Sequence, residues 1–489
     1  MAPIISEINP RLLGGLDPEN RELCTLEATV VTGLEEVACE ECKEKLGANC
    51  VVARGRLFID VNPEQVPEVL KLRSIDNVNI VLSMVKNFSF PSEREKCFEQ
   101  LYMLAEKPDW KKGMEVWRRT LGYEEEPIKE EKLLTGDFCQ PRPDVDLKMM
   151  KSTSQIVNNI PRALLPKHLK LDEEGLAKED EVQLSEDKDS VEENNEVSHT
   201  RDYCLSGPKF RVSCNRTGTR HIFGSPEAAR QFGAGINEKF NWPVDLKNFD
   251  LEVILYIDNE FVYVALALTR EALFKRNLTN FGRTNLRATL CYNMVRLAAP
   301  KPGEVVIDPM CGGATIPIEG SLTYTKSFHL GGDNFGQAVK RSRDNIDWLV
   351  NKGKSMSVDV AQWDATRLPL REQCVDIVVS DLPFGKRIGS KTDNRVLYFH
   401  ALLELARVTR IKTGRAVLLT YDHRSMIKNI KRVHTLWKSG ASRTVNVGGL
   451  SAVIYILHRT SLLCDTGLRK DSKDKEKKSP GSPGGSATN

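Results

Sequence analysis

The sequence of 489 residues predicts an α/β protein that ends in a Rossmann-like domain. From residue 283 onward, apolar runs typical of buried strands alternate with segments of helical periodicity, which implies a parallel sheet covered by helices on both faces. A final pair of strand-like runs is joined through Gly448-Gly449 and should form an antiparallel hairpin. The expected strands are 305–307, 327–330, 357–360, 374–379, 415–420, 444–447 and 452–457, and the helices between them include 337–351 and 397–410.

The final hairpin separates two kinds of Rossmann-like domain. Five parallel strands closed by an antiparallel pair is the arrangement of class I methyltransferases, whereas a plain dinucleotide-binding domain does not need that pair. We therefore expect residues 283–462 to form a Rossmann-like class I methyltransferase domain.

Two smaller α/β units are expected in the N-terminal half. Residues 26–82 show the order strand, helix, strand, strand, helix, strand, which is typical of a ferredoxin-like domain, and Gly47 should end the first helix. A second module contains a strand at 210–213, a helix with Ser225 as its cap and Pro226 at its first position, and a hairpin through Asp258-Asn259. We place the ferredoxin-like domain at 20–90 and the second module at 201–275.

Residues 91–200 are expected to be partly helical at first, with Trp110 and Trp117 as apolar anchors, and then a disordered acidic insert. The window 171–198 holds twelve Asp or Glu and two Lys, so it carries a net charge of −10 and the rest of the chain carries +13. A basic body of this kind is compatible with a polyanionic partner, although a solubilising surface would look the same. Residues 463–489 are rich in Lys, Ser and Gly and should be a disordered tail.

The composition excludes several classes of protein. No apolar run approaches the roughly 20 residues that span a bilayer, so we expect no membrane association, and the first residues lack the pattern of a secretory signal. The twelve cysteines are scattered, which indicates reduced thiols in the cytoplasm, with the nucleus as the alternative. Cys39 and Cys42 have the spacing of metal ligands, but no second pair lies nearby, so no metal site is expected.

The first strand of the C-terminal domain runs into a turn of small residues, where a nucleotide-like ligand binds in open α/β sheets. Gly312 and Gly313 let the backbone approach such a ligand. Asp333 follows the second strand and could accept from ribose hydroxyls, and Asp364 follows the third and could accept from an adenine amino group. The turn lacks the glycine spacing of the nicotinamide fingerprint, so the expected cofactor is S-adenosylmethionine. The expected cofactor contacts are Asp308, Met310, Cys311, Gly312, Gly313, Asp333, Asn334, Asp364, Ala365 and Asp381.

The fourth strand ends in Ser380-Asp381-Leu382-Pro383-Phe384-Gly385, which resembles the signature of methyltransferases that act on exocyclic amines. Such an amine is a poor nucleophile, and two acceptors, Asp381 and the carbonyl of Leu382 or Pro383, would aim its lone pair at the methyl group. Pro383 would stiffen the loop and Phe384 would stack on a flipped-out base. We therefore predict Asp381, Pro383 and Phe384 as catalytic residues, followed by Lys386 and Arg387 as contacts to substrate phosphates.

A basic cluster in the second module predicts a surface that contacts RNA, although a solvated face is the alternative. It comprises Lys209, Arg211, Arg216, Arg220 and His221, with Phe210 and Phe223 nearby.

These motifs together resemble the THUMP-domain tRNA guanosine-N2 methyltransferases, over about 26–82 and 210–459. The resemblance rests on Gly33-Leu34-Glu35-Glu36, Arg54-Gly55-Arg56, Phe210-Arg211-Val212-Ser213, Arg220-His221, Phe223-Gly224-Ser225, Val244-Asp245-Leu246 and the Asp-Leu-Pro-Phe loop. Leu286-Arg287-Ala288-Thr289 is similar to the segment that packs over the cofactor, which adds Thr289 to the expected contacts. The glycine loop departs from the family by reading Gly-Gly-Ala-Thr at 312–315, so a weakened cofactor site is an alternative.

The resemblance implies three further properties. The module at 201–275 would be a THUMP module that grips the acceptor region of tRNA and its 3′ end, and the methylated base would be an acceptor-stem guanosine. A small zinc-binding activator subunit would join the catalytic domain as a heterodimer. The alternatives are an RNA adenine-N6 methyltransferase and an RNA-binding scaffold without turnover, the latter motivated by Ala314. A nicotinamide oxidoreductase is disfavoured by the missing fingerprint.

Overall fold

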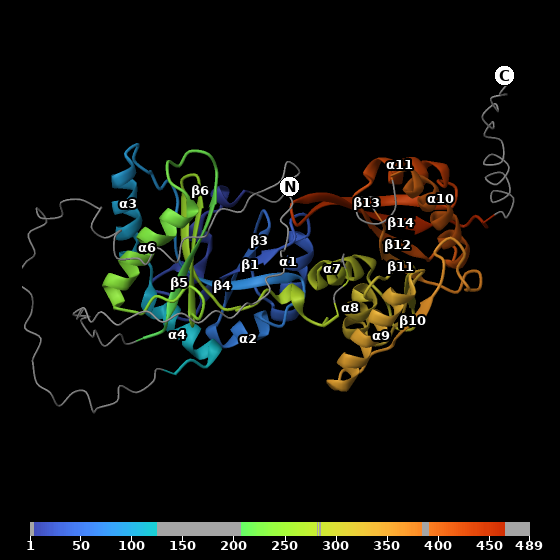
Figure 1. Cartoon of the computed structure of the whole chain (residues 1–489), viewed down its shortest axis with the longest axis horizontal. Helices are drawn as coiled ribbons and strands as arrows, with labels where there is room; N and C mark the ends of the chain where they lie inside the picture. The colour runs from blue at the N-terminus through green and yellow to red at the C-terminus, as the bar shows by residue number, and fades with distance from the viewer. Residues whose placement is uncertain (1–3, 125–206, 281, 283–284, 384–390, 465–489) are drawn as a thin grey trace, which may run out of the picture. The chain divides into compact units, whose positions relative to one another are not determined.

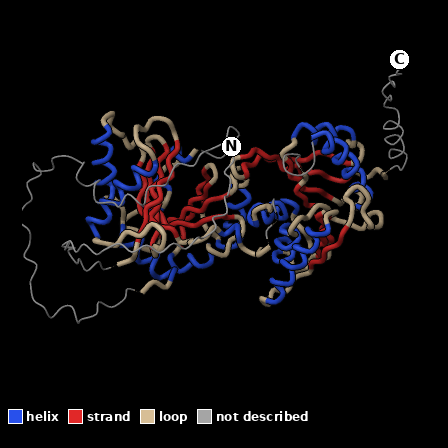
Figure 2. Tube along the Cα trace, in the orientation of Figure 1, coloured by secondary structure: helices blue, strands red, loops and turns tan. Residues whose placement is uncertain are grey.

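The computed structural model describes residues 4–124, 207–280, 282, 285–383 and 391–464, and these belong to one compact unit. Their strands form two seven-stranded sheets, each covered by helices (Figure 1), and Figure 2 shows the two sets of strands in red. The acidic window 171–198 and the C-terminal tail lie outside the described residues. No described helix is long and apolar enough to cross a membrane.

The first sheet has the strand order β2-β3-β1-β4-β7-β6-β5. Its strands are β1 (Cys24–Val30), β2 (Cys50–Ala53), β3 (Arg56–Val61), β4 (Ile75–Val85), β5 (Phe210–Thr217), β6 (Leu251–Asp258) and β7 (Phe261–Ala267). The first four strands, with α1 (Glu35–Leu46) and α2 (Val66–Val69), have the predicted ferredoxin-like order, and Gly47 ends α1 in a left-handed conformation. The predicted hairpin through Asp258-Asn259 is formed by β6 and β7.

Strand β4 joins the two predicted N-terminal units into one sheet. Its residues 75–80 pair with β1, and residues 79–85 pair with β7 of the second module. The sequence predicted only 79–82 as strand, because the polar residues Asp76 and Asn77 interrupt the apolar pattern. The N-terminal domain and the second module therefore share one sheet and form a single body, which we call the first body.

Helices α3 (Arg94–Met103), α4 (Trp110–Leu121) and α6 (Ser225–Phe240) pack into the core of this first body. Trp110 and Trp117 are buried there, so the helical residues assigned from sequence to the start of the insert belong to the body itself. The cap of α6 is Gly224 and not Ser225, because the carboxylate of Glu227 accepts a hydrogen bond from the Gly224 N–H over 2.9 Å.

The second sheet has the order β10-β9-β8-β11-β12-β14-β13, in which β8 to β12 are parallel and β14 is antiparallel to both neighbours. Its strands are β8 (Val305–Asp308), β9 (Phe328–Asp333), β10 (Val358–Gln362), β11 (Ile377–Asp381), β12 (Arg415–Thr420), β13 (Trp437–Val447) and β14 (Leu450–Arg459). This arrangement confirms the predicted class I methyltransferase fold.

Helices cover both faces of the second sheet, as predicted. Those on one face are α7 (Ala288–Ala298), α8 (Thr315–Thr323) and α9 (Gly336–Asn351), and those on the other are α10 (Lys391–Val408) and α11 (His423–Arg432). The sequence did not predict α11, whose polar face outweighs its few buried residues, including Met426 and Ile430.

The first body and the second sheet share a hydrophobic core. Val31 and Leu34, which precede α1, and Val37 in its first turn pack with residues of α7 and β14. The backbone N–H of Asn446 on β13 donates to the carbonyl of Thr32 over 3.1 Å. The ferredoxin-like part is therefore packed directly against the methyltransferase domain.

Candidate active site

The turn between β8 and α8 is tied to the ends of the neighbouring strands. Asp308 is buried, and its carboxylate accepts hydrogen bonds from the Ser380 hydroxyl over 2.7 Å and from the Met310 N–H over 3.2 Å. Burial raises the pKa of Asp308 to about 8, and the nearby carboxylates of Asp381 and Asp333 act in the same direction. Asp308, Asp333 and Asp381, all predicted as cofactor contacts, thus lie close together. The hydrogen bonds of Asp308 are made to other residues of the protein.

The glycine turn leaves open space at its outer surface. Gly312 has a left-handed backbone with φ +57°, and a Cβ added there would meet nothing within 4 Å. Its N–H donates to Asp333 over 3.1 Å, while the other oxygen of Asp333 accepts from the Phe335 N–H over 3.0 Å. Cys311 is buried and its N–H donates to the Gly332 carbonyl over 2.8 Å. The turn and the end of β9 are therefore held side by side.

Ala314 has a left-handed backbone with φ +62° at the N-terminus of α8. For a residue with a Cβ this conformation costs about 1–2 kcal/mol. The departure of this loop from the commoner glycine pattern therefore falls at a position that favours glycine.

The end of β10 lies beside the end of β9, with Gln362 opposite Asp333. Asp364 is exposed, and its Oδ1 accepts from both the N–H and the hydroxyl of Thr366 over 2.8 Å. Ala365 is buried. The turn residue that sequence reasoning missed is Trp363, whose buried indole N–H donates to the Pro309 carbonyl over 3.1 Å. Its only sequence signal was an aromatic residue between a strand and a polar turn.

Asp381 is the last residue of β11, the strand that neighbours β8. Its Oδ1 is buried and has no hydrogen-bond partner among the described residues. Burial raises the pKa of this carboxyl to about 7. A buried acceptor without a partner costs free energy, so it points to a ligand group that would donate to it.

Tyr398 on α10 fixes the loop that follows Asp381. Its buried hydroxyl lies 2.6 Å from the carbonyl oxygen of Pro383, to which it donates, and 2.7 Å from the hydroxyl of Thr420 at the end of β12. The N–H of Leu382 donates to the Leu419 carbonyl over 2.9 Å. Sequence reasoning missed Tyr398 and Thr420 because both are distant from the loop along the chain. The predicted residues Phe384, Lys386 and Arg387 lie outside the described residues.

Comparisons with known proteins identify the family of this chain. Residues 193–267 match the model of the THUMP domain, and residues 276–452 match that of an RMKL-like methyltransferase domain. The chain is 38% identical to the tRNA (guanine(6)-N(2))-methyltransferase THUMP3 of Bos taurus, over 89% of this chain and 88% of that protein. It belongs to the THUMP-domain tRNA guanine-N2 methyltransferases.

Other similar proteins extend the comparison. The U6 snRNA (guanine-N(2))-methyltransferase THUMPD2 of Mus musculus is 27% identical over 81% of this chain and 74% of its own length. The crystal structure of TrmN from Thermus thermophilus has a TM-score of 0.60 at 21% identity and covers 89% of this chain and 99% of that one. SMU.472, a putative methyltransferase complexed with SAH, has a TM-score of 0.56 at 16% identity, covering 90% and 99%.

As a member of this family, the protein is an S-adenosylmethionine-dependent methyltransferase. The described residues fit that cofactor, since the glycine turn is open above Gly312 and the unpartnered oxygen of Asp381 lies at the end of a neighbouring strand. In the described part of the chain, no group of three or more His, Cys, Asp or Glu side chains is placed to hold a metal ion.

The basic residues of the THUMP module differ in their exposure and in their partners. Arg211 donates twice to Glu252, over 3.1 and 2.8 Å, and its guanidinium lies 3.8 Å from the centre of the Phe249 ring. Arg220 is exposed and pairs with exposed Glu260 over 3.2 Å. The guanidinium of Arg211 is therefore held by contacts within the protein, whereas that of Arg220 is accessible to solvent.

Arg216 and His221 form a small network beside that exposed arginine. An Nη atom of Arg216 lies 3.3 Å from Nδ1 of His221, and Nε2 of His221 lies 2.8 Å from the carbonyl oxygen of Asn259. His221 is only partly buried, so this network lies at the surface.

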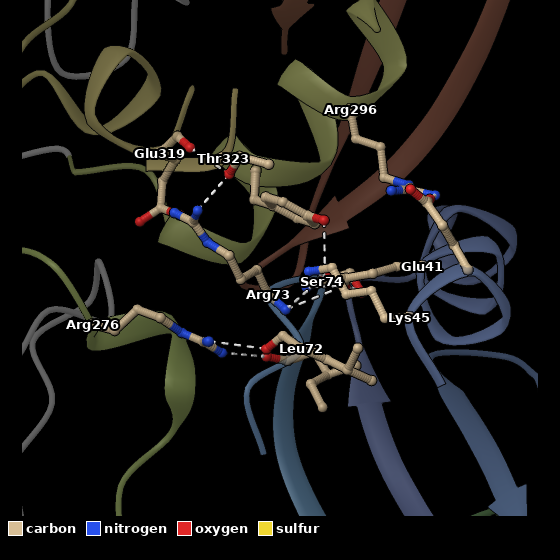
Figure 3. Close-up of polar contacts among 12 residues, drawn as sticks. Glu41, Lys45, Leu72, Arg73, Ser74, Arg276, Arg296, Glu319 and Thr323 are labelled. Atoms are coloured by element: carbon tan, nitrogen blue, oxygen red, sulfur yellow. Dashed lines mark hydrogen bonds and ion pairs between the residues drawn. The ribbon is translucent and has the colours of Figure 1, made fainter. Parts of the chain in front are cut away.

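Two residues of the methyltransferase domain contact the first body instead of the open side of the turn. Thr289, predicted from the resemblance as a cofactor contact, is fully buried, and its hydroxyl donates to Asp76 over 2.6 Å. Glu319 on α8 is buried and pairs with Arg73 (Figure 3). It also accepts a hydrogen bond from Asn277 over 2.7 Å.

Proposed function

We propose that this protein forms N2-methylguanosine in the acceptor stem of tRNA. The observation that carries the proposal is the buried Oδ1 of Asp381 at the end of β11, which has no hydrogen-bond partner among the described residues and lies next to the open glycine turn. The name of the Bos taurus relative specifies guanine 6 of tRNA, and its 38% identity extends over most of both chains.

The cofactor would be held at the ends of three neighbouring strands. The backbone of Gly312 would line its methionine part, Asp333 the ribose and Asp364 the adenine, each through oxygens or N–H groups at the sheet edge. When bound, S-adenosylmethionine supplies an electrophilic methyl group that passes to the amine.

The residues after β11 would prepare the guanine amine. Asp381 accepts one N–H of the amine through its free Oδ1, and a backbone carbonyl of Leu382 or Pro383 accepts the other. These bonds turn the nitrogen lone pair out of the ring plane and toward the methyl group. As the new N–C bond forms, the S–C bond of the sulfonium breaks and its electron pair stays on sulfur. The amine would release its proton to the carboxylate of Asp381, whose pKa burial raises to about 7.

The test is nucleoside analysis by mass spectrometry after incubation of unmodified RNA with the protein and S-adenosylmethionine. We expect N2-methylguanosine in tRNA and none in U6 snRNA, which is the substrate in the name of the more distant relative. A rise in methyladenosine without N2-methylguanosine would favour the adenine-N6 alternative. Absence of any methylated nucleoside, with intact RNA binding, would favour the scaffold alternative.

We also propose a small zinc-binding activator as the partner subunit and the cytoplasm as the site of action, as the family resemblance implies. Co-purification followed by the same assay, with and without the small subunit, tests the partnership. Turnover by the chain alone that does not increase when the subunit is added would remove the activator from the proposal.

A further inference from the structure

A group of buried charges joins the first body to the methyltransferase domain (Figure 3). Arg73 lies just before β4, and its guanidinium pairs with Glu319 and donates to the hydroxyl of Thr323, both on α8. The side chain of Glu319 is 1% exposed and that of Arg73 is 14% exposed, so this pair is almost withdrawn from water.

Glu41 on α1 holds the backbone around Arg73. Its carboxylate, 0% exposed, accepts from the N–H groups of Arg73, over 3.1 and 3.2 Å, and of Ser74, over 2.9 Å. It also accepts from the hydroxyl of Tyr292 on α7 over 2.8 Å and pairs with Lys45 over 2.5 Å. A helix of the first body and a helix of the methyltransferase domain thus share one carboxylate.

The segment between the THUMP module and α7 is fastened to both sides of the same contact. Arg276 donates to the carbonyls of Leu72 and Ile75 over 2.9 and 3.3 Å, and Asn277 donates to Glu319 over 2.7 Å. We call Glu41, Arg73, Arg276, Asn277 and Glu319 the junction cluster.

The junction cluster and the apolar contact beside it have different physical roles. The shared core around Val31, Leu34 and Val37 supplies adhesion, but apolar contacts are non-directional and tolerate small shifts. Buried ion pairs add little net stability, because desolvation offsets their attraction, yet breaking one leaves an uncompensated charge. When all of their charged groups have partners, buried ion pairs favour one relative placement of the helices and strands that carry them.

That placement connects the RNA-binding side to the reacting side. On one side, β4 belongs to the same sheet as β5, which carries Arg216 of the predicted RNA surface. On the other side, Glu319 lies on α8, which begins directly after the glycine turn. A change of register at the junction cluster would therefore move the RNA surface relative to Asp381.

We propose that the junction cluster is a positioning element that determines which nucleotide of a bound RNA reaches Asp381. This inference rests on the proposed function, since it assumes that the THUMP side holds the RNA. It assigns the cluster no contact with substrate or cofactor.

The test compares the native protein with R73M/E319Q, which removes both charges and keeps the approximate volumes and the acceptor for Asn277. The substrates are tRNA transcripts in which a guanosine is moved one base pair at a time along the acceptor stem. We expect the native protein to favour one position sharply. In the variant, the ratio of methylation at that position to its neighbours should fall at least tenfold, with S-adenosylmethionine affinity unchanged. A ratio within twofold of the native one, at unchanged melting temperature and cofactor affinity, would overturn the proposal.

The matched control is K71M/E68Q, which removes an exposed ion pair next to Arg73 and should leave the ratio unchanged. If R73M/E319Q does not fold, Thr323→Val, which removes only the hydroxyl that Arg73 reaches, replaces it. That variant should lower the ratio at least twofold, and an unchanged ratio would count against the proposal.

A measurement without catalysis separates this inference from the proposed function. Spin labels at the exposed positions Glu95 and Lys354 report the distance between the first body and the methyltransferase domain. We expect a narrow distribution in the native protein and a broader one in the variant that folds. If the native protein makes no N2-methylguanosine, the proposed function fails, and the distance distribution alone tests the role of the junction cluster. A broader distribution in the variant supports the cluster as the element that fixes the placement. An unchanged width contradicts it.

Discussion

The hydroxyl of Tyr398 donates to the carbonyl oxygen of Pro383 over 2.6 Å, and the hydroxyl oxygen of Thr420 lies 2.7 Å from that of Tyr398. This arrangement occupies one lone pair of the Pro383 carbonyl and connects the loop after Asp381 to the end of β12. That loop is therefore held by a helix that begins after it in the chain.

We predict that Tyr398→Phe lowers kcat by about 10- to 100-fold, because small displacements of a positioning loop have effects of this size. The KM for tRNA and the affinity for S-adenosylmethionine should change little. Tyr263→Phe is the matched control, since that buried hydroxyl has no partner among the described residues. Equal kcat values for Tyr398→Phe and the native protein would show that the hydrogen bond does not position the loop.

The rate of methyl transfer should depend on the ionisation of Asp381. The carboxylate is an acceptor only when ionised, and burial raises its pKa to about 7, so the single-turnover rate should rise with pH through about 7 and then level off. Below pH 6 the rate should fall about tenfold for each pH unit. Asp381→Asn should lose this dependence, and a native rate that stays flat between pH 5.5 and 7.5 would contradict the assignment.

The same raised pKa has a consequence for stability. Because the folded protein favours the protonated form of Asp381, this group stabilises the fold fully below its ordinary pKa of 3.8. Its contribution is lost as the pH rises through about 7. The acceptor needed for catalysis is thus charged where its contribution to stability has been lost.

Gly33 provides a test of the contact between the first body and β13. It has φ +97°, and an added Cβ would overlap the carbonyl oxygen of Thr444. Gly47 is also left-handed, at φ +63°, but nothing lies within 4 Å of the position of its Cβ. Gly47→Ala should cost about 1 kcal/mol from the backbone alone, whereas Gly33→Ala should cost more than about 3 kcal/mol. Thermal denaturation of both variants measures the difference, and similar losses would show that the contact is loose.

The two arginines of the THUMP module should differ in RNA binding. Arg220→Gln should weaken tRNA binding severalfold and reduce the dependence of log K on log salt by about one, because an exposed charge of the predicted RNA surface is lost. Arg211→Gln should mainly lower the melting temperature, since that guanidinium is held by Glu252 and Phe249. Binding measured over a salt series tests both, and equal slopes for native protein and Arg220→Gln would remove Arg220 from the RNA surface.

Periodicity and turn residues predicted most of the fold, because both sheets consist of short strands with clear apolar patterns. The prediction was incomplete at β4, where half of the strand pairs with a partner about 180 residues away and polar residues weaken the pattern. It also missed α11, whose apolar stripe is narrow.

In the candidate site, too, the sequence predicted some residues and missed the roles of others. The motifs located Asp308, Asp333 and Asp381, because each of these acids directly ends a strand. The roles of Glu319 and Thr289 were not predictable from local sequence, since their partners Arg73 and Asp76 are more than 200 residues away. Long-range polar pairing leaves no periodic signal along the chain.

The most direct test of this account compares the native protein with Asp381→Asn in single-turnover methyl transfer to tRNA, with both saturated by S-adenosylmethionine. We predict that N2-methylguanosine formation is slower by at least about a hundredfold in the variant. If Asp381→Asn methylates guanosine at the native rate, the carboxylate at the end of β11 is not the acceptor that prepares the amine.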